Sequence, residues 1–337
     1  MASLLRLVVV IAITATLVVH SRAEFNPDGT ANLFVYYAQA SGRNASLGEL
    51  CRHPSIDAVI LGFIRDFNNT AGYPTVDFGR WICPGKRPAN STVAPGLATC
   101  PELSDEMRKC QARGKKVFVS IGGATSNTSF DGDGGGRDAE NAARALWDLF
   151  GEGTASPDLR PLGNVTIDGF DIDHEVGSPS NYDTFTKTLR SLLATASKPM
   201  WISAAPLCAL SNRSIGPKTL ALVDFIFVRF YNAKGCSIGT KGFAASLVKW
   251  YETMPEPLAA FPKFYLSGLS FDNNNSGFVP PSEFADAVRL ARTPDMQRFN
   301  ENKFGGVALW DGSRGLATMA GNGHDFLAYT KNVLEAA

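Results

Sequence analysis

Residues 168–175 read Asp168-Gly169-Phe170-Asp171-Ile172-Asp173-His174-Glu175. Apolar residues precede these acids and alternate with them, which indicates a strand of the protein core. Side chains alternate between the two faces of a strand, so Asp171, Asp173 and Glu175 project to one face and His174 to the other. The rest of the chain therefore has to accommodate three carboxylates on one face of a core strand.

This stretch contains the fourth of eight short apolar runs of the kind that forms parallel strands buried on both faces. The expected strands are 33–37, 58–63, 116–121, 166–171, 200–205, 225–231, 264–269 and 306–310. Amphipathic segments between them predict helices, with Asp183, Ser282 and Asp325 as caps near three of their starts; the clearest are 140–150, 182–196, 243–251, 281–290 and 324–334. Alternating strands and helices predict an α/β fold, a single-domain (β/α)8 TIM barrel. A doubly wound open sheet is the alternative that the pattern leaves open.

In a barrel, the acidic face of this strand leads to the mouth, by which we mean the end of the barrel where its strands finish. Enzymes with this fold carry their reactive groups at that end. Like charges a few ångströms apart in a desolvated site cannot all ionise, so at least one pKa is raised. A carboxyl with a raised pKa is what general acid catalysis near neutral pH requires.

Two other interpretations of the acids stay open. The strand could face solvent, although burial of its apolar neighbours Val165, Ile167 and Phe170 argues against this. The acids could instead hold a hard cation. The chain has four histidines, and they show no ligand spacing, so we predict no metal; they are His20, His53, His174 and His324.

The composition limits the classes of partner. Lys and Arg together number 32 and so do Asp and Glu, so the formal net charge is zero and we predict no nucleic-acid partner. Hydrophobic residues make up 45% of the chain, which is enough to bury a large core. No apolar run reaches the roughly 18 residues that a membrane span needs, so we predict no membrane association of the mature chain.

The first residues, 1–23, have the pattern of a secretory signal peptide. Arg6 supplies a basic start, residues 7–19 are apolar, and Ser21 and Ala23 are small residues at a cleavage site. We therefore expect a secreted, extracellular protein whose domain comprises residues 24–337. An uncleaved membrane anchor is the alternative.

Cysteines and glycosylation sequons fit an extracellular setting. The cysteines are even in number, and outside the cell they are expected to form disulfides, although sequence alone leaves their pairing open. They are Cys51, Cys83, Cys100, Cys110, Cys208 and Cys236. N-x-[ST] sequons, which predict glycosylation, begin at Asn44, Asn68, Asn90, Asn127, Asn164, Asn212 and Asn274.

Residues 168–175 match D-G-x-D-x-D-x-E and so resemble the catalytic signature of glycoside hydrolase family 18, the retaining chitinases. Nearly the whole of residues 24–337 is most similar to the class III, hevamine-type and related fungal chitinases of that family. The other matching segments are Tyr36-Tyr37-Ala38-Gln39, Ser120-Ile121-Gly122-Gly123, Ala204-Ala205-Pro206-Leu207-Cys208, Phe230-Tyr231-Asn232, Gly277-Phe278-Val279-Pro280-Pro281 and Leu309-Trp310. The resemblance implies a TIM barrel with the disulfides Cys51–Cys110, Cys83–Cys100 and Cys208–Cys236.

The resemblance also implies an activity, that of an endochitinase hydrolysing β-1,4-N-acetylglucosamine linkages with retention. Glu175 would be the general acid and later the base, while Asp173 would orient the substrate's own acetamido group, which is the nucleophile. Asp171 would share a proton with Asp173, and Tyr231 would donate a hydrogen bond to the acetamido carbonyl. The residues implied to bind substrate are Tyr36, Gln39, Phe63, Gly123, Arg229 and Trp310, with ordinary barrel core as the alternative for Phe63 and Trp310. The implied protein is a monomer that binds chitin or chito-oligosaccharides and uses no cofactor.

Arg229 departs from the pattern, because class III chitinases usually have Gln at this place. With period two it shares the face of Tyr231, so its guanidinium points into the mouth, where it would lower the pKa of Asp173 or Glu175. Non-catalytic relatives of the cereal xylanase-inhibitor type carry Arg here, but they lose part of the acid set, which is intact in this chain. An active enzyme is therefore favoured. The alternatives are an inactive lectin or enzyme inhibitor and an endo-β-N-acetylglucosaminidase acting on glycoproteins.

Overall fold

The structure is a computed structural model. It describes residues 24–37, 39, 45–67, 72–79, 82–83, 87–88, 94, 97–126, 128–210, 214–254, 262–274, 277–297, 303–321 and 323–336. The expected signal peptide, 1–23, lies outside the described residues, as do Ala38 and the sequon asparagines Asn44, Asn68, Asn90, Asn127 and Asn212. Asn164 and Asn274 are described, and both are exposed.

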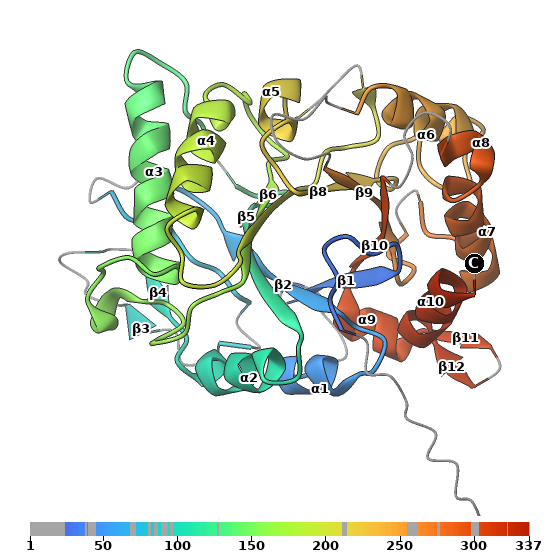
Figure 1. The fold of residues 1–337 in the computed structure, drawn as a ribbon, viewed down its shortest axis with the longest axis horizontal. Coiled ribbons are helices and arrows are strands. Elements are labelled where there is room, and N and C mark those ends of the chain that lie inside the picture. The colour runs from blue at the N-terminus through green and yellow to red at the C-terminus, as the bar shows by residue number, and fades with distance from the viewer. Residues whose placement is uncertain are drawn as a thin grey trace, which may run out of the picture.

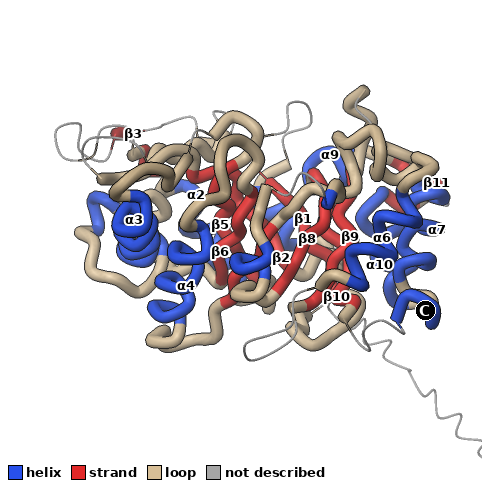
Figure 2. The backbone as a smooth tube through the Cα atoms, turned by 90° about the horizontal axis from the view of Figure 1, so that it is seen from above, coloured by secondary structure: helices blue, strands red, loops and turns tan. Residues whose placement is uncertain are grey.

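Eight parallel strands close into a barrel in the order β1-β10-β9-β8-β7-β6-β5-β2. They are β1 (Asn32–Tyr37), β2 (Ala58–Ile64), β5 (Lys116–Gly122), β6 (Gly169–Asp173), β7 (Trp201–Ala204), β8 (Phe225–Arg229), β9 (Lys263–Leu269) and β10 (Phe304–Trp310). Figure 1 shows the ring of strands with helices around it, and Figure 2 shows the same strands from the side. The predicted (β/α)8 barrel is confirmed, and the open sheet is wrong because β1 pairs with both β2 and β10.

Helices surround the strands, and each predicted helix is present. They are α1 (Leu47–Arg52), α2 (Glu102–Gln111), α3 (Gly135–Phe150), α4 (Tyr182–Leu193), α5 (Pro217–Leu220), α6 (Phe243–Glu252), α7 (Pro281–Ala291), α8 (Pro294–Gln297), α9 (Gly312–Ala317) and α10 (Phe326–Glu335). Two short hairpins, β3 (Arg87–Pro88) with β4 (Ala98–Thr99) and β11 (Met319–Gly321) with β12 (His324–Asp325), and a 3-10 turn, η1 (Pro157–Leu159), complete the described elements. In the described part of the chain, no helix combines the length and the apolar character that crossing a membrane requires.

One of the three predicted helix caps is confirmed. Asp325 caps α10, where its side chain accepts a hydrogen bond from the Ala328 N–H at 2.8 Å. Asp183 and Ser282 are wrong, because each lies inside the first turn of its helix. α4 is preceded by Asn181, and α7 starts at a proline whose missing N–H needs no cap.

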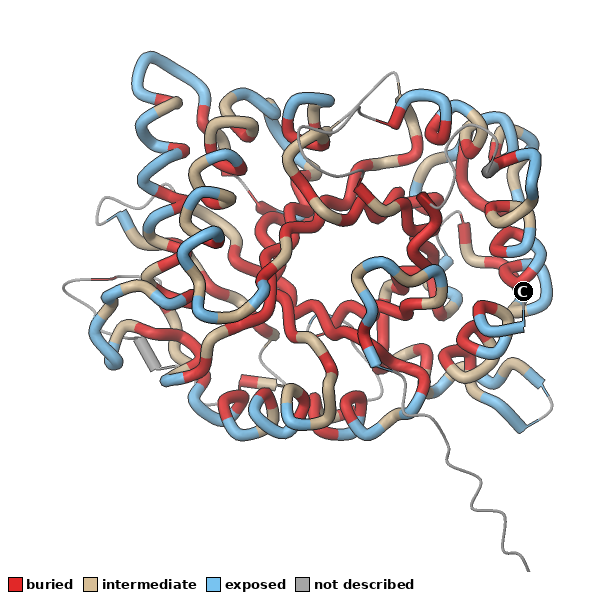
Figure 3. Tube along the Cα trace, viewed as in Figure 1, coloured by how far each residue is buried: buried red, intermediate tan, exposed pale blue. Residues whose placement is uncertain are grey.

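Because side chains alternate between the two faces of each strand, the protein has one core between the strands and the helices and another inside the barrel. On β1, Leu33 and Val35 pack outward against the helices, while Phe34 and Tyr36 belong to an aromatic-rich cluster inside the barrel. The Phe34 ring contacts five rings of this cluster, those of Phe25, Phe118, Phe225, Phe227 and Tyr265. Figure 3 shows the result, a buried ring of strands inside helices whose outer faces are exposed. The barrel interior is therefore a filled core below its mouth.

The opposite end of the barrel, where the strands begin, we call the floor. Three aspartates lie there, each one residue before a strand: Asp57 before β2, Asp168 before β6 and Asp224 before β8. Each accepts a hydrogen bond from a backbone N–H of the adjacent strand, and these donors are Leu33 at 2.6 Å, Val117 at 2.9 Å and Ile202 at 2.7 Å. These bonds satisfy N–H groups at the ends of the ladder and fix neighbouring strands to one another.

Each floor aspartate also has a cation of its own. The pairs are Lys331 with Asp57 at 2.8 Å, Lys198 with Asp168 at 2.8 Å and Arg190 with Asp224 at 2.9 Å. Lys331 is the most buried of the three cations, with 9% of its side chain exposed against 33% for Lys198. Each floor acid thus has a cation within ion-pair distance, and Lys331 also lies 3.7 Å from Glu335.

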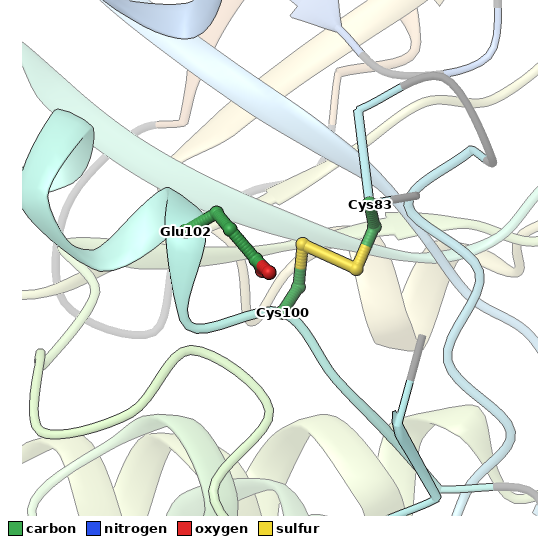
Figure 4. A group of neighbouring side chains, drawn as sticks. All are labelled: Cys83, Cys100 and Glu102. Atoms are coloured by element: carbon green, nitrogen blue, oxygen red, sulfur yellow. A yellow bond between two sulfur atoms is a disulfide. The ribbon is translucent and has the colours of Figure 1, made fainter. Parts of the chain in front are cut away.

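The structure contains the three disulfides that the resemblance implied. Cys51–Cys110 joins α1 to α2, and Cys208–Cys236 joins the loops that follow β7 and β8. The third, Cys83–Cys100, lies beside the Glu102 carboxylate (Figure 4). Among the described residues, Cys83, Cys100 and Glu102 form the group whose potential metal-ligand atoms all lie within 4.8 Å of one another. The two sulfurs are bonded to each other, so they are not thiolate ligands.

Candidate active site

The three acids of residues 168–175 lie at the mouth, at increasing exposure. Asp171 and Asp173 are on β6 and point inward, and the strand ends at Asp173, so Glu175 lies two residues beyond it. Asp171 is fully buried, while 7% of the Asp173 side chain and 25% of the Glu175 side chain are exposed. His174 points the other way and packs against Tyr182 of α4 with ring centroids 4.4 Å apart. Of the three acids, Glu175 is the one that reaches solvent.

Three hydroxyl groups hold the Asp171 carboxylate. Ser120 and Tyr36 donate to Oδ2 at 2.6 and 2.9 Å, and Ser203 donates to Oδ1 at 2.7 Å. Burial raises the pKa of Asp171, and these three hydrogen bonds oppose the rise. Ser120 and Ser203 are the register partners of Asp171 on β5 and β7. Sequence reasoning gave no role to either serine, although their place in the same interior layer follows from the alternation of β5 and β7.

Asp173 is the most strongly perturbed acid of the site. Burial raises its pKa well above the usual range, Arg229 opposes this rise, and Glu175 and Asp171 add to it. Its Oδ1 atom is buried and has no hydrogen-bond partner among the residues that the structure describes. Asp173 therefore holds a proton at a pH where an exposed aspartate has lost its own.

Arg229 lies between Asp173 and Glu175, as its predicted orientation requires. Its Nη1 atom is 3.4 Å from Asp173 Oδ1 and forms a closer ion pair with Glu175 Oε2. Only 5% of its side chain is exposed. Burial disfavours its charged form, but the two acids hold the pKa of the guanidinium above its ordinary value. Arg229 thus stays a cation inside the site.

Tyr231 follows β8 and is buried beside these charges. Burial raises the pKa of its phenol, so the hydroxyl stays protonated and able to donate. Gly277 lies directly behind it with φ of 103°, and a Cβ at this glycine would be 2.5 Å from Tyr231 Cα. The loop after β9 therefore needs a glycine where it packs on Tyr231.

Aromatic rings form one wall of the mouth. The rings of Phe63 and Trp310 are stacked at 5.9 Å with an interplanar angle of 18°, and Tyr36 lies 5.7 Å from Trp310. Trp310 is partly exposed, whereas Phe63 is 7% exposed. This wall places an apolar face next to the acids.

Gly123 and Gln39 hold the backbone around that wall. A Cβ at Gly123 would be 2.9 Å from the Phe63 ring, and the Gly123 N–H donates to the Asp173 carbonyl at 2.8 Å. The Gln39 side-chain amide donates to the carbonyls of Gly62 at 3.0 Å and Asp77 at 2.6 Å. Both residues are at the mouth, where they support Phe63 and Asp173.

Asp311, the residue after Trp310, is an acid that no sequence motif indicated. Burial raises its pKa to about 6. Its Oδ1 atom caps α9 by accepting from the Arg314 N–H at 3.0 Å, and no described residue forms a hydrogen bond with its buried Oδ2 atom. The available signal was its position as an Asp between a strand and Gly312, which is typical of an N-cap.

The chain is similar to proteins of one known family. The sequence model described as Glycosyl hydrolases family 18 matches residues 32–265. An endochitinase of Saccharomyces cerevisiae is 30% identical over 315 residues, which are 93% of this chain and 52% of that protein. Endochitinase 3 of Metarhizium anisopliae is 30% identical over 282 residues, or 83% of this chain and 91% of that protein. The chain thus spans about half the length of the yeast relative.

Solved structures with the same fold include both enzymes and inhibitors. A chitinase from Ipomoea carnea has a TM-score of 0.70 and 25% identity, covering 90% of this chain and 99% of its own. A xylanase and alpha-amylase inhibitor protein from Scadoxus multiflorus has a TM-score of 0.67 and 25% identity, covering 91% of this chain and 99% of its own. The fold alone therefore does not separate the two functions.

Proposed function

The chain belongs to the glycosyl hydrolases of family 18, and from that premise we propose that it is an active, secreted endochitinase. It hydrolyses β-1,4 linkages between N-acetylglucosamine units with retention of configuration. Residues 1–23 are its signal peptide and residues 24–337 its monomeric catalytic barrel. The observation that carries the proposal is the arrangement of the acids, in which Asp173 and Glu175 adjoin and Glu175 alone of the three reaches solvent.

Glu175 is the proposed general acid and base. Protonated, it donates its proton to the glycosidic oxygen as the bond to the anomeric carbon breaks. The carbonyl oxygen of the substrate's own acetamido group attacks that carbon and forms a cyclic oxazolinium, which replaces the enzyme-bound intermediate of other retaining glycosidases. Glu175, now a carboxylate, then removes a proton from the water that opens the ring.

Asp173 and Tyr231 bind the acetamido group in this proposal. The ionised Asp173 carboxylate accepts from the acetamido N–H and stabilises the positive charge of the oxazolinium. Tyr231 donates to the acetamido carbonyl, for which its protonated phenol is suited. Asp171 stays fixed by its three hydroxyl donors, and its charge helps to keep a proton on the neighbouring pair.

The aromatic wall supplies the apolar surface for the sugar ring. Trp310, the partly exposed ring, carries the pyranose, while Phe63 and Tyr36 support Trp310 from behind. Gln39 and Gly123 contribute by fixing the backbone around Phe63. Since the nucleophile comes from the substrate, no step of the proposed mechanism involves a metal or an organic cofactor.

The test compares wild type with Glu175→Gln on chitin oligosaccharides and on a high-mannose glycoprotein. We expect wild type to release shorter oligomers whose new reducing ends form as the β-anomer, and Glu175→Gln to lose roughly 10²–10⁴-fold in rate, the usual contribution of a general acid. Glu140→Gln, which changes an exposed carboxylate on α3, is the matched control and keeps full activity. Cleavage confined to the glycoprotein would instead identify an endo-β-N-acetylglucosaminidase.

A second candidate, a carbohydrate-binding protein or enzyme inhibitor without turnover, is favoured by one observation. Glu175 is engaged by Arg229, which stabilises its carboxylate and so opposes its role as an acid. The inhibitor from Scadoxus multiflorus shares the fold at 25% identity. Tight oligomer binding by wild type without any cleavage would establish this candidate over the enzyme.

A further inference from the structure

One guanidinium nitrogen serves two carboxylates in this site. Arg229 Nη1 is paired with Glu175 Oε2 and lies 3.4 Å from Asp173 Oδ1, an atom with no hydrogen-bond partner in the described part of the chain. Both carboxylates are thus within ion-pair distance of the same nitrogen. The backbone of Arg229 is fixed meanwhile, because its N–H donates to Pro206 at 2.9 Å and its carbonyl accepts from Cys208 at 3.1 Å.

We infer that Arg229 is a positioning residue that determines which of the two carboxyls, Asp173 or Glu175, carries their shared proton. Its catalytic meaning rests on the proposed function, whereas the protonation states themselves do not. When Nη1 bonds Glu175, that residue is the carboxylate and Asp173 is the acid. When Nη1 bonds Asp173, the proton has moved from an Asp173 oxygen to a Glu175 oxygen and the guanidinium charge is unchanged.

The other described side chains around Asp173 and Glu175 differ from Arg229 in their charge. Asp171 on β6, Tyr36 on β1 and Tyr231 after β8 are acidic or neutral, and His174 points away behind the strand. At this level of the barrel interior, β5, β7 and β9 carry Ser120, Ser203 and Ser267. The strands β2 and β10 carry the aromatic rings of Phe63 and Trp310. Among these groups Arg229 carries the positive charge.

Substrate binding then moves the proton. An acetamido N–H that approaches Asp173 stabilises its ionised form, which transfers the proton to Glu175 and attracts Nη1 to Asp173. The structure shows the arrangement of the free site, in which Arg229 Nη1 is paired with Glu175. The loaded site has its acid protonated and its acetamido-binding carboxylate charged, the two conditions that the proposed mechanism needs together.

The direct test is infrared spectroscopy of wild-type protein labelled with 13C at the carboxyl groups of Glu or, separately, of Asp. The probe is a thio-linked, non-hydrolysable N-acetylglucosamine oligomer, added near neutral pH. We expect the C=O stretch of a protonated carboxyl to shift with the Glu label only after the oligomer binds, and this band to be missing in Glu175→Gln. A Glu-sensitive band already present in free wild type, or absent from both states, would overturn the inference.

Arg229→Gln provides the second measurement, with Arg229→Lys as the variant that keeps the charge. Without the guanidinium, the titration of the pair followed by 13C NMR should move upward by roughly 1–3 pH units, the usual effect of a neighbouring cation, and both limbs of the kcat/KM profile should follow. Unchanged titration in folded Arg229→Gln would refute the inference. Shifted titration in a protein that never cleaves chitin would refute the proposed function alone.

Discussion

The buried acids at the two ends of the barrel differ in how many cations accompany them. At the floor, Asp57, Asp168 and Asp224 each have one backbone N–H donor and one cation. At the mouth, Asp171, Asp173 and Glu175 adjoin one another around the single guanidinium of Arg229. Residue type and burial are similar at the two ends, so the difference lies in how many cations accompany the acids.

This difference determines whether an acid stabilises the fold or shares a proton that can be transferred. An acid that pairs with a cation and accepts from a backbone N–H contributes to holding strands together, even where burial raises its pKa, as it does for Asp57. Acids that outnumber their cations must share protons, and a shared proton is one that can be transferred. Both kinds of acid occur along one segment, since Asp168 directly precedes β6 and Asp173 is the last residue of that strand.

The largest effect is expected when a floor acid loses its cation. Lys331→Met should lower the free energy of unfolding by about 3–5 kcal/mol, because it leaves the buried Asp57 carboxylate without its ion pair. Denaturant unfolding measures this loss. Lys198→Met is the matched control and should cost only about 1 kcal/mol, because Lys198 is more exposed and Asp168 keeps its bonds from Val117 and Gln111. Equal losses in the two variants would contradict the dependence on burial.

Next in size is the effect of removing a mouth acid. Asp173→Asn should reduce kcat on chitin oligosaccharides by roughly 10²–10³-fold, since a neutral amide cannot stabilise the oxazolinium charge. Thermal unfolding should not occur at a lower temperature, because Asp173 of the free site is protonated and neutral and so is the amide that replaces it. Asp168→Asn should do the reverse, with lower stability and an unchanged kcat for the folded fraction. If Asp173→Asn destabilised the fold as Asp168→Asn does, the two ends would not differ in the way described.

The smallest effect concerns Asp311, a mouth acid behind Trp310. Its pKa in the folded state, about 6, is above the ordinary value of 3.8, so the folded state binds the proton more tightly than the unfolded state does. Its contribution is present below pH 4 and is lost as the pH rises to 6, with a total of about 3 kcal/mol or less. Asp311→Asn keeps an N-cap residue and should abolish this part of the pH dependence. Parallel stability curves for the two proteins between pH 4 and 7 would disprove it.

Much of the fold could be predicted from local patterns. The eight apolar runs gave all eight strands, because strands buried on both faces need continuous hydrophobic sequence. The period of two along a strand likewise predicted that Asp171, Asp173 and Arg229 face the same interior space. The disulfide pairing, in contrast, came from the resemblance to a family, because spacing alone does not determine it.

What could not be predicted depends on contacts between distant segments. Lys331 and Asp57 are 274 positions apart, and neither lies in a motif. Asp183 and Ser282 were expected to cap helices that in fact each begin one residue earlier, because the sequence does not show which residue leaves the extended conformation. The distance of Arg229 from Glu175 likewise depends on how two nonadjacent strands curve toward the centre of the barrel.

The anchoring of β6 at Asp168 has a consequence for protein engineering. The side chain of Asp168 binds the Val117 N–H at one end of the strand, and the Gly123 N–H binds the Asp173 carbonyl at the other. Inserting or deleting one residue between these two hydrogen bonds would turn the acids beyond it toward the helices. Residues 168–175 and the β5 segment that is hydrogen-bonded to them should therefore be exchanged between homologous barrels as one unit.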